Sequence, residues 1–406
     1  MKYSIRGKWN KYVFDLILTC YIQNHIKSPL TWKPSQLQPN HAITQSRNHA
    51  IDLLRIIAMF MVCMIHINLF TKAYDEAAII PGKEYFFTVG LWTETVGYIG
   101  VNVYALITGY VCLHSKWRLS RYLELWGQVA FYTIGLLIVG LLLSHFGILP
   151  WDITKKYIAK ILLRLPAGST YWYFAAYSAL FLIIPFINKL LLSLRQREHL
   201  LLLGVLMLVL PCANILQSST MYIGGYNATW LAALYAAGAY IKRFPPHISP
   251  WITGAVALLC TLQPLLCWML HLPQILSYCS PVMVVYSLCL FLFVYKWPIN
   301  STFFRKLIMW AAPVSFGVYL IHVHPWCWAM LKRYVPALNE YLDYPWWIAI
   351  VGGAILYLIC AVVDWLRSLL FHLCRVRKLA DCVGSFIETS VTKILNRILP
   401  ENEQNF

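Results

Sequence analysis

The sequence predicts an all-α membrane protein, a polytopic bundle of about ten transmembrane helices with both termini in the cytoplasm. Two observations lead to this prediction. Of the 406 residues, 60% are hydrophobic and only 12% are charged. Apolar runs recur along the whole chain, and each is near the roughly 20 residues that a bilayer-spanning helix requires. A soluble domain of this size does not need so much apolar surface, so the soluble classes are excluded.

The predicted transmembrane helices follow one another without an internal repeat. The weakest run, 223–241, is rich in Ala and Gly, but the loops on either side of it suit a membrane span. The ten runs lie at 51–71, 88–113, 122–148, 171–191, 199–216, 223–241, 251–270, 279–297, 308–331 and 345–366.

Two tails flank the predicted transmembrane domain at 48–366. Residues 1–47 are polar and basic, and their one apolar patch, Tyr12–Tyr21, is too short to span a bilayer. The patch also lacks the small residues of a cleavage site, so a removed signal peptide is not expected. Residues 367–406 mix apolar residues with Arg and Lys, which predicts a cytoplasmic amphipathic tail.

The placement of the basic residues predicts the orientation. Most of the 33 lysines and arginines lie in the two tails and in every second loop, beginning with 114–121. Cytoplasmic segments carry such an excess, so these segments are placed inside. The loop at 149–170 is the exception, because it is assigned to the outside and yet contains four basic residues. The loops assigned to the outside contain Lys72, Lys83, Lys155, Lys156, Lys160, Arg164, Lys332 and Arg333.

The first predicted span contains ionisable residues on one side. In the stretch IDLLRIIAMFMVCMIH, Arg55 and His66 are separated by ten residues, and Asp52 precedes Arg55 by three. Eleven helical steps of about 100° end about 20° past three full turns, so Arg55 and His66 share one stripe, about 16 Å apart. Ionisable groups inside a membrane helix are costly, which predicts a functional site facing a polar cavity.

A late span repeats this arrangement. Ser315, Tyr319 and His322 follow one another at i, i+4 and i+7 and therefore share a helix face. Under the predicted topology, His66 and His322 both lie about 21–22 Å from the inner edge of the membrane. Two polar stripes at equal depth predict that the histidines line one cavity. For each histidine alone, a packed hydrogen bond between helices is the alternative reading.

A third polar region spans the second predicted helix and the loop after it. Asn102 is a polar group at membrane depth, while Gly97, Gly100 and Gly109 permit close helix contact. Arg118 and Arg121 follow at the cytoplasmic surface, three residues apart and on one face. Paired guanidinium groups suit the binding of phosphates, although positive-inside anchoring explains the spacing equally well.

Other chemistries find little support in the sequence. The chain has no P-loop, no nucleotide-binding glycine fingerprint and no H-E-x-x-H motif. The 12 cysteines form no C-x-x-C pair and are read as packing residues, and no metal site is expected. The net charge of +17 is attributed to membrane topology and to contact with anionic lipids. Nucleic acid is not an expected partner, because the basic residues are scattered over several loops.

These motifs together resemble the acyltransferase-3 family of integral membrane O-acyltransferases, in particular the bacterial O-acetyltransferases that modify surface polysaccharides. The resemblance rests on IDLLRIIAMFMVCMIH, IGVNVYALITGYVC, KWRLSRY and SFGVYLIH, in this order. The stretch YWYFAAYSALFLIIPFI resembles the family's fourth span, with Trp172 and Pro185. One position differs, since Thr108 stands where the family usually has Ser. The match covers about 48–366.

The resemblance implies a membrane O-acyltransferase of the bacterial inner membrane. The donor is expected to be acyl-coenzyme A, usually acetyl-coenzyme A, and the acceptor a hydroxyl of a cell-surface or lipid-linked glycan. His66 corresponds to the catalytic residue, either as a general base or, less simply, through an acyl-histidine. Arg55 corresponds to its partner, on the donor side. Arg118 and Arg121 are candidates for binding the coenzyme A phosphates. The expected supporting or substrate-binding residues are Asp52, Asn102, Ser315, Tyr319 and His322.

Two other classes remain open at this point. A transporter or flippase of a lipid-linked glycan also has many spans and intramembrane charges, but the sequence lacks repeat symmetry and paired broken helices. A non-catalytic membrane scaffold is the second alternative, and it predicts that His66 is replaceable without loss of activity.

Overall fold

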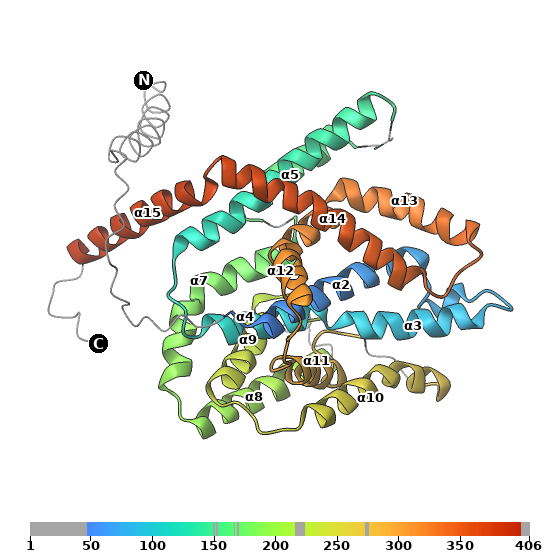
Figure 1. Cartoon of the computed structure of the whole chain (residues 1–406), viewed down its shortest axis with the longest axis horizontal. Coiled ribbons are helices and arrows are strands. Elements are labelled where there is room, and N and C mark those ends of the chain that lie inside the picture. The colour runs from blue at the N-terminus through green and yellow to red at the C-terminus, as the bar shows by residue number, and fades with distance from the viewer. Residues whose placement is uncertain are drawn as a thin grey trace. The chain divides into compact units, whose positions relative to one another are not determined.

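Every regular element in the described part of the chain is a helix, which confirms the all-α prediction (Figure 1). The computed structural model describes residues 47–148, 151, 153–165, 167–168, 170–215, 224–272 and 276–398. The elements are α2 (His49–Thr71), η1 (Glu76–Ala78), α3 (Glu84–Tyr98), α4 (Gly100–Cys112), α5 (Leu119–His145), α6 (Lys155–Arg164), α7 (Trp172–Ser193), α8 (Gln196–Ile215), α9 (Ala228–Arg243), α10 (Pro250–Met269), α11 (Pro281–Val294), α12 (Thr302–His322), α13 (Pro325–Tyr341), α14 (Ile348–Leu373) and α15 (Val376–Ile398).

The chain divides into two compact units. One unit, here called the bundle, is Asn48–Arg377, and the other consists of 1–47 with 378–406. The bundle contains α2 to α14, and α14 continues to Leu373, seven residues past the predicted end of the last span. The predicted N-terminal tail lies outside the described residues except for Arg47.

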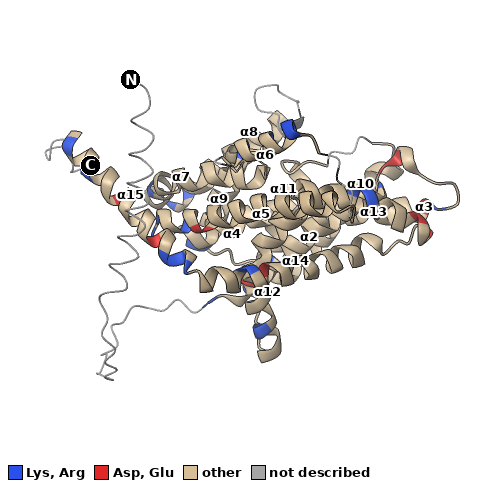
Figure 2. Ribbon diagram, turned by 90° about the horizontal axis from the view of Figure 1, so that it is seen from above, with Lys and Arg blue, Asp and Glu red and all other residues tan. Residues whose placement is uncertain are grey.

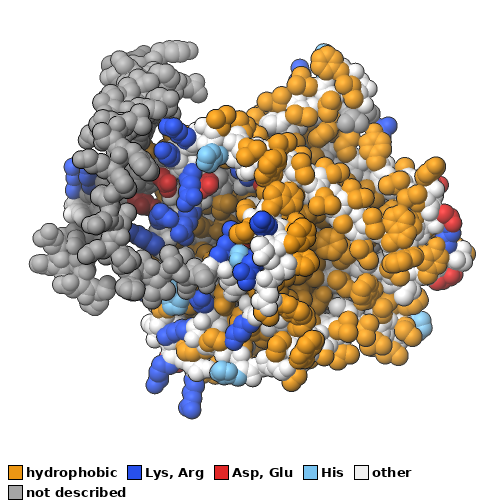
Figure 3. Space-filling model, viewed as in Figure 1, with side chains coloured by type: hydrophobic (Ala, Val, Ile, Leu, Met, Phe, Trp, Pro, Cys, Tyr) orange, Lys and Arg blue, Asp and Glu red, His pale blue; other side chains and the backbone are white. Residues whose placement is uncertain are grey.

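The described residues of the bundle form eight helical segments that are long and apolar enough to cross a membrane. Two further predicted runs form shorter helices, namely α9 with 16 residues and α11 with 14. Hydrophobic side chains cover much of the visible surface of the bundle, as a lipid environment requires (Figure 3). The protein is therefore a multi-pass membrane protein.

Two predicted spans are interrupted. The run 88–113 becomes α3 and α4, which meet at Ile99, with Gly97 and Gly100 on either side. The run 308–331 ends as α12 at His322, and a separate helix, α13, occupies the predicted outer loop at 332–344. The reason for the second break is Pro325, since a proline cannot donate a backbone hydrogen bond and disfavours the helical conformation at the residue before it. His324 is accordingly non-helical, with φ −58° and ψ 138°, and its side chain caps α13.

The exceptional loop at 149–170 contains the short amphipathic helix α6. Its four basic residues are the ones that depart from the positive-inside pattern. Its apolar Leu163 is 81% exposed, while Ile161 packs against Leu137 and Trp151 in a small apolar cluster. Such a helix suits the membrane interface, where lysine side chains extend toward the headgroups while their stems lie on apolar surface.

Helix α2 is the centre of the bundle, because it contacts α3, α4, α11, α12, α13 and α14. Glycines allow the closest approaches, as the sequence predicted. A Cβ on Gly100 would stand 2.6 Å from the carbonyl oxygen of Ala58 on α2. A Cβ on Gly109 would stand 1.9 Å from the carbonyl oxygen of Tyr235, and so α4 packs directly against the backbone of α9.

Contacts between loops show which helix ends lie together at each end of the bundle. At one end, Asn48 donates to the carbonyl oxygen of Tyr295, and Arg243 donates to that of Leu194. At the other end, Lys83 pairs with Asp343. Basic segments gather near the ends of α4 and α7, and both acidic and basic segments lie at the opposite end near α3 and α10 (Figure 2). The loops predicted to share a side of the membrane therefore lie together.

The close packing of α4 on α9 predicts that Gly109→Val destabilises the bundle. The added side chain would overlap the backbone of Tyr235, and overpacking of this kind costs about 1–3 kcal/mol. We expect a lower midpoint of thermal unfolding for the purified protein in detergent. Gly135→Val is the matched control, since a Cβ on this helical glycine meets nothing within 4 Å. Equal midpoints for the two variants would contradict the packing argument.

The orientation of the bundle is a separate prediction. In an otherwise cysteine-free variant, single cysteines at 155 and 340 should react with an impermeant thiol reagent in spheroplasts. A cysteine at 196 should react only after the membrane is opened, because its loop is predicted to be cytoplasmic. Labelling at 196 from outside, with none at 155, would invert the orientation.

Candidate functional site

The histidines of the two predicted polar stripes touch each other. His66 on α2 and His322 on α12 approach to 2.9 Å between Nδ1 of His66 and Nε2 of His322. The His322 side chain is fully buried. The two helices are far apart in sequence, so this contact joins the first span to a late one.

The hydrogen bonds determine the tautomers of this histidine pair. Nδ1 of His322 lies 2.6 Å from the carbonyl oxygen of Val318. A carbonyl oxygen only accepts, so Nδ1 of His322 carries the proton, and Nε2 of the neutral ring is an acceptor. His66 therefore donates a hydrogen bond from its Nδ1–H to Nε2 of His322. Nε2 of His66 then carries the lone pair. It makes no hydrogen bond within the described residues.

His66 lines a small cavity of about 60 Å³, here called the histidine cavity. Its walls are aromatic and apolar, and Tyr104, Trp172 and Tyr319 are among them. Trp328 on α13 covers the other side of the imidazole with its ring edge, at 4.9 Å between ring centroids. Trp328 lies in a segment that the sequence placed near the end of a single long span, so its role was not foreseen.

The predicted supporting residues have different surroundings. Tyr319 lines the histidine cavity, and its buried hydroxyl has no hydrogen-bond partner among the described residues. Ser315 interacts instead with Tyr357 on α14, at 3.2 Å. His322 lies behind His66 and is not part of the cavity lining. Their functional roles stay predictions.

Asn102 forms a structural junction between helices. Its amide nitrogen donates to the carbonyl oxygen of Tyr278 at 2.9 Å and to Ser287 at 3.1 Å. Its amide oxygen accepts from the indole of Trp230 at 3.0 Å. These bonds use the buried amide to join α4, α9 and α11. A direct role of Asn102 in substrate binding has no support from this geometry.

Arg55 lies between the histidine cavity and the basic end of the bundle. It forms an ion pair with the buried carboxylate of Asp52 on the preceding turn. Its backbone carbonyl accepts a hydrogen bond of 2.9 Å from Tyr104, which lines the histidine cavity. Its guanidinium and that of Arg121 both act electrostatically on Tyr177. Arg55 thus faces the same region as the predicted arginine pair.

Arg118 and Arg121 line a larger cavity of about 590 Å³ at the basic end, here called the arginine cavity. Arg118 is the last residue before α5, so this helix begins at the cavity wall. Arg367 and His372 on α14 add further basic groups, and Glu124 is an acidic residue of the lining. The predicted arginine pair therefore belongs to a concave site and not to a flat surface.

The two cavities follow one another along the same two helices. On α7, Phe181 and Tyr177 line the arginine cavity, and Tyr173, one turn further, lines the histidine cavity. On α12, Pro313 lines the first cavity and Phe316 the second. The two cavities therefore lie next to each other along α7 and α12.

The structure also contains an ionic network that the sequence analysis missed. Asp364 on α14 is fully buried and pairs with Arg367 at 2.9 Å. Its carboxylate also accepts from Gln128 at 3.0 Å and from Tyr132 at 2.8 Å. A signal was present, because Asp364 and Arg367 repeat the spacing of Asp52 and Arg55 inside an apolar run.

Comparison with known proteins identifies the family of the chain. A family model described as an acyltransferase domain, acyltransferase-3, matches residues 48–365. No curated protein and no solved structure matches the chain. The matched range covers most of the chain and contains His66, Arg55, Arg118 and Arg121, whereas Arg367 and His372 of the arginine cavity lie just beyond it. The chain therefore belongs to the acyltransferase-3 family and is a membrane acyltransferase.

Proposed function

We propose that the protein is an O-acetyltransferase that moves the acyl group of acetyl-coenzyme A to a hydroxyl of a cell-surface or lipid-linked glycan. We place it in the bacterial inner membrane, with the donor on the cytoplasmic side. The observation that supports this proposal best is the geometry of His66. His66, whose Nε2 makes no hydrogen bond within the described residues, lines a small cavity that follows an arginine-lined cavity along α7 and α12.

The arginine cavity suits the donor. Coenzyme A carries several phosphate charges, and guanidinium groups bind phosphate through paired, charge-assisted hydrogen bonds. Arg118 and Arg121 are assigned to these phosphates, at the mouth where α5 begins. The pantetheine arm would then extend past Tyr177 and Arg55. This direction places the thioester at the histidine cavity.

The reaction needs a base that takes the hydroxyl proton and later passes it to the departing thiolate. The acceptor hydroxyl oxygen attacks the thioester carbonyl carbon, while Nε2 of His66 takes the hydroxyl proton. The carbon–sulfur bond then breaks, and the proton on Nε2 passes to the departing thiolate. His66 thereby regains its starting form, and the acyl group leaves as an ester of the acceptor.

Neighbouring side chains support this cycle. Nε2 of His322 accepts a hydrogen bond from the Nδ1–H of His66, which orients the imidazole and stabilises the positive charge that forms on it. The unpartnered hydroxyl of Tyr319 lines the same cavity and is available to donate to the thioester oxygen as it gains negative charge. Asp52 holds the guanidinium of Arg55 at the donor side.

His66→Ala should reduce acyl transfer by about 10²–10⁴-fold, which is the usual contribution of a general acid–base group. The measurement is the release of coenzyme A thiol by purified protein supplied with acetyl-coenzyme A and a glycan-lipid extract. His247→Ala is the control, because His247 is exposed on a loop outside both cavities. Transfer by His66→Ala within a few-fold of wild type would remove His66 from the mechanism.

Replacing Arg118 and Arg121 together by Gln should raise the apparent KM for acetyl-coenzyme A by about tenfold or more, with a smaller change in kcat. The KM of the wild type should also rise with salt, since accessible charges are screened.

The matched control for this pair is Arg195→Gln with Arg197→Gln. These arginines are exposed and lie outside the lining of the arginine cavity, in another loop that is predicted to be cytoplasmic. An equal change in donor KM for both double variants would leave membrane anchoring as the explanation of Arg118 and Arg121.

A further inference from the structure

Four aromatic rings from separate parts of the chain form one cluster beside the histidine cavity. Tyr278 lies 4.7 Å from Tyr98, 4.9 Å from Tyr226 and 5.9 Å from Trp172, between ring centroids. Trp172 and Tyr226 are 4.5 Å apart. The cluster joins α3, the start of α7 and the segments that precede α9 and α11. We call these residues the aromatic cluster.

The aromatic cluster is continuous with the catalytic histidine. Trp172 and Tyr278 line the same cavity as His66. Tyr278 is buried, whereas Tyr226 is 44% exposed. The cluster therefore has one side at the reacting centre and another that is accessible from outside the cavity.

A buried acidic group lies near the aromatic cluster. Glu94 on α3 is buried and accepts a hydrogen bond of 3.0 Å from Asn68, while its second oxygen makes no hydrogen bond within the described residues. Glu94 interacts electrostatically with Tyr98 and Tyr278 of the cluster. It also interacts with Tyr74, whose pKa is raised to about 12 by partial burial and by this carboxylate.

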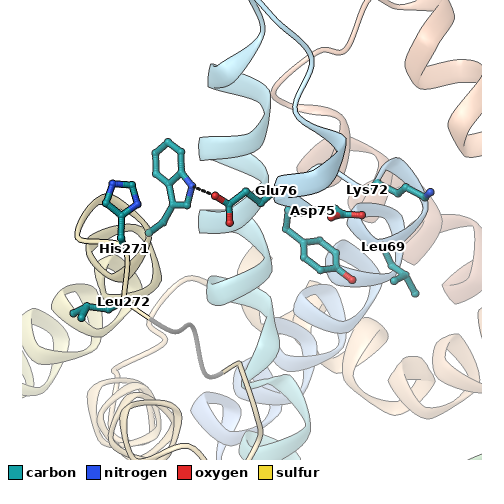
Figure 4. A pocket seen from close by; sticks show the side chains of 8 residues that line it. Leu69, Lys72, Asp75, Glu76, His271 and Leu272 are labelled. Atoms are coloured by element: carbon teal, nitrogen blue, oxygen red, sulfur yellow. Dashed lines mark hydrogen bonds between the residues drawn. The ribbon is translucent and has the colours of Figure 1, made fainter.

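Tyr74, which interacts electrostatically with Tyr226 of the cluster, lines a third cavity of about 850 Å³ at the end of the bundle opposite to the arginines. Asp75 and Glu76 line this outer cavity, and Glu76 accepts a hydrogen bond of 3.2 Å from the indole of Trp268 (Figure 4). Lys72 and His271 are the basic residues of its described lining. Together with Glu94, carboxylates predominate on this side of His66.

We propose that the outer cavity and the aromatic cluster form the acceptor site, and that this site selects an uncharged sugar ring over an acidic one. This inference rests on the proposed function and specifies its acceptor. The carbon–hydrogen face of a pyranose buries apolar area against aromatic rings, and carboxylates accept hydrogen bonds from its hydroxyls. A uronic acid or a phosphorylated sugar would be repelled by Asp75 and Glu76, which line the outer cavity.

The arginine cavity and the outer cavity therefore have opposite charge preferences. The polyanionic donor meets arginines, and the acceptor meets carboxylates, with His66 between them. This separation keeps coenzyme A from the acceptor site, because like charges in apposition disfavour the wrong ligand.

The first test concerns the stacking surface. Tyr226→Leu should raise the apparent KM for a glycan-lipid extract of the producing cells by about tenfold, which corresponds to about 1.4 kcal/mol. The KM for acetyl-coenzyme A should stay unchanged. Tyr226→Phe keeps the ring and should retain the acceptor KM. Tyr341→Leu is the control, because this tyrosine is 85% exposed on α13, outside the cluster.

The second test concerns charge. Methyl glucopyranoside and methyl galactopyranoside should compete with the glycan-lipid extract, and the matching hexuronides should compete about tenfold less well. Asp75→Asn combined with Glu76→Gln should reduce this difference, since both changes remove charge and keep the hydrogen-bonding shape. Equal competition by hexosides and hexuronides in the wild type, or no competition by either hexoside, would overturn the proposed selectivity.

The outcomes separate this inference from the function on which it rests. Absence of coenzyme A release by the wild type with the extract would refute glycan acylation itself. Release by the wild type, together with an unchanged acceptor KM in Tyr226→Leu, would refute only the acceptor site. A change of donor KM equal to that of acceptor KM would indicate a general disturbance of the bundle and would also count against the site.

Discussion

The contact between the imidazoles of His66 and His322 constrains much of the bundle around it. Two polar rings inside a membrane protein need partners, because an unsatisfied polar group there is costly. The carbonyl oxygen of Val318 orients His322, and His322 in turn orients His66. This chain of bonds requires α2 and α12 to meet at one depth. Helix α2 then lies at the centre, with α3, α4, α13 and α14 packed around it.

Besides the histidines, the bundle contains two Asp–Arg ion pairs with the same spacing in sequence. On α2 and on α14, an aspartate precedes an arginine by three residues, so each guanidinium is neutralised within its own helix. The pair on α14 is the more elaborate, because Gln128 and Tyr132 complete the shell of Asp364. A buried ion pair adds little net stability, whereas loss of one partner leaves an uncompensated charge. Their presence beside the arginine cavity agrees with a functional use of the arginines.

The candidate site was partly visible in the sequence. The helical period placed Arg55 and His66 on one stripe, and equal depth brought His322 to the same level. The pairing of Asp364 with Arg367 was equally readable, but a residue at the end of an apolar run is easily assigned to the loop. The position of Trp328 over His66 was not readable, because it depends on the break at Pro325 and on the return of α13 toward α2.

By itself the sequence determined the all-α membrane class, the family, the positions of most spans and the polar face of each helix. The family follows from the resemblance of several motifs in a fixed order, and the other properties follow from composition and from periodicity along one chain segment. Only the tertiary structure decided that Asn102 is a packing junction, that Ser315 faces α14, and that Trp172 and Tyr278 adjoin His66. The physical reason is that a helix face has several possible neighbours, and the choice among them depends on how side chains from distant segments fill the space between the helices.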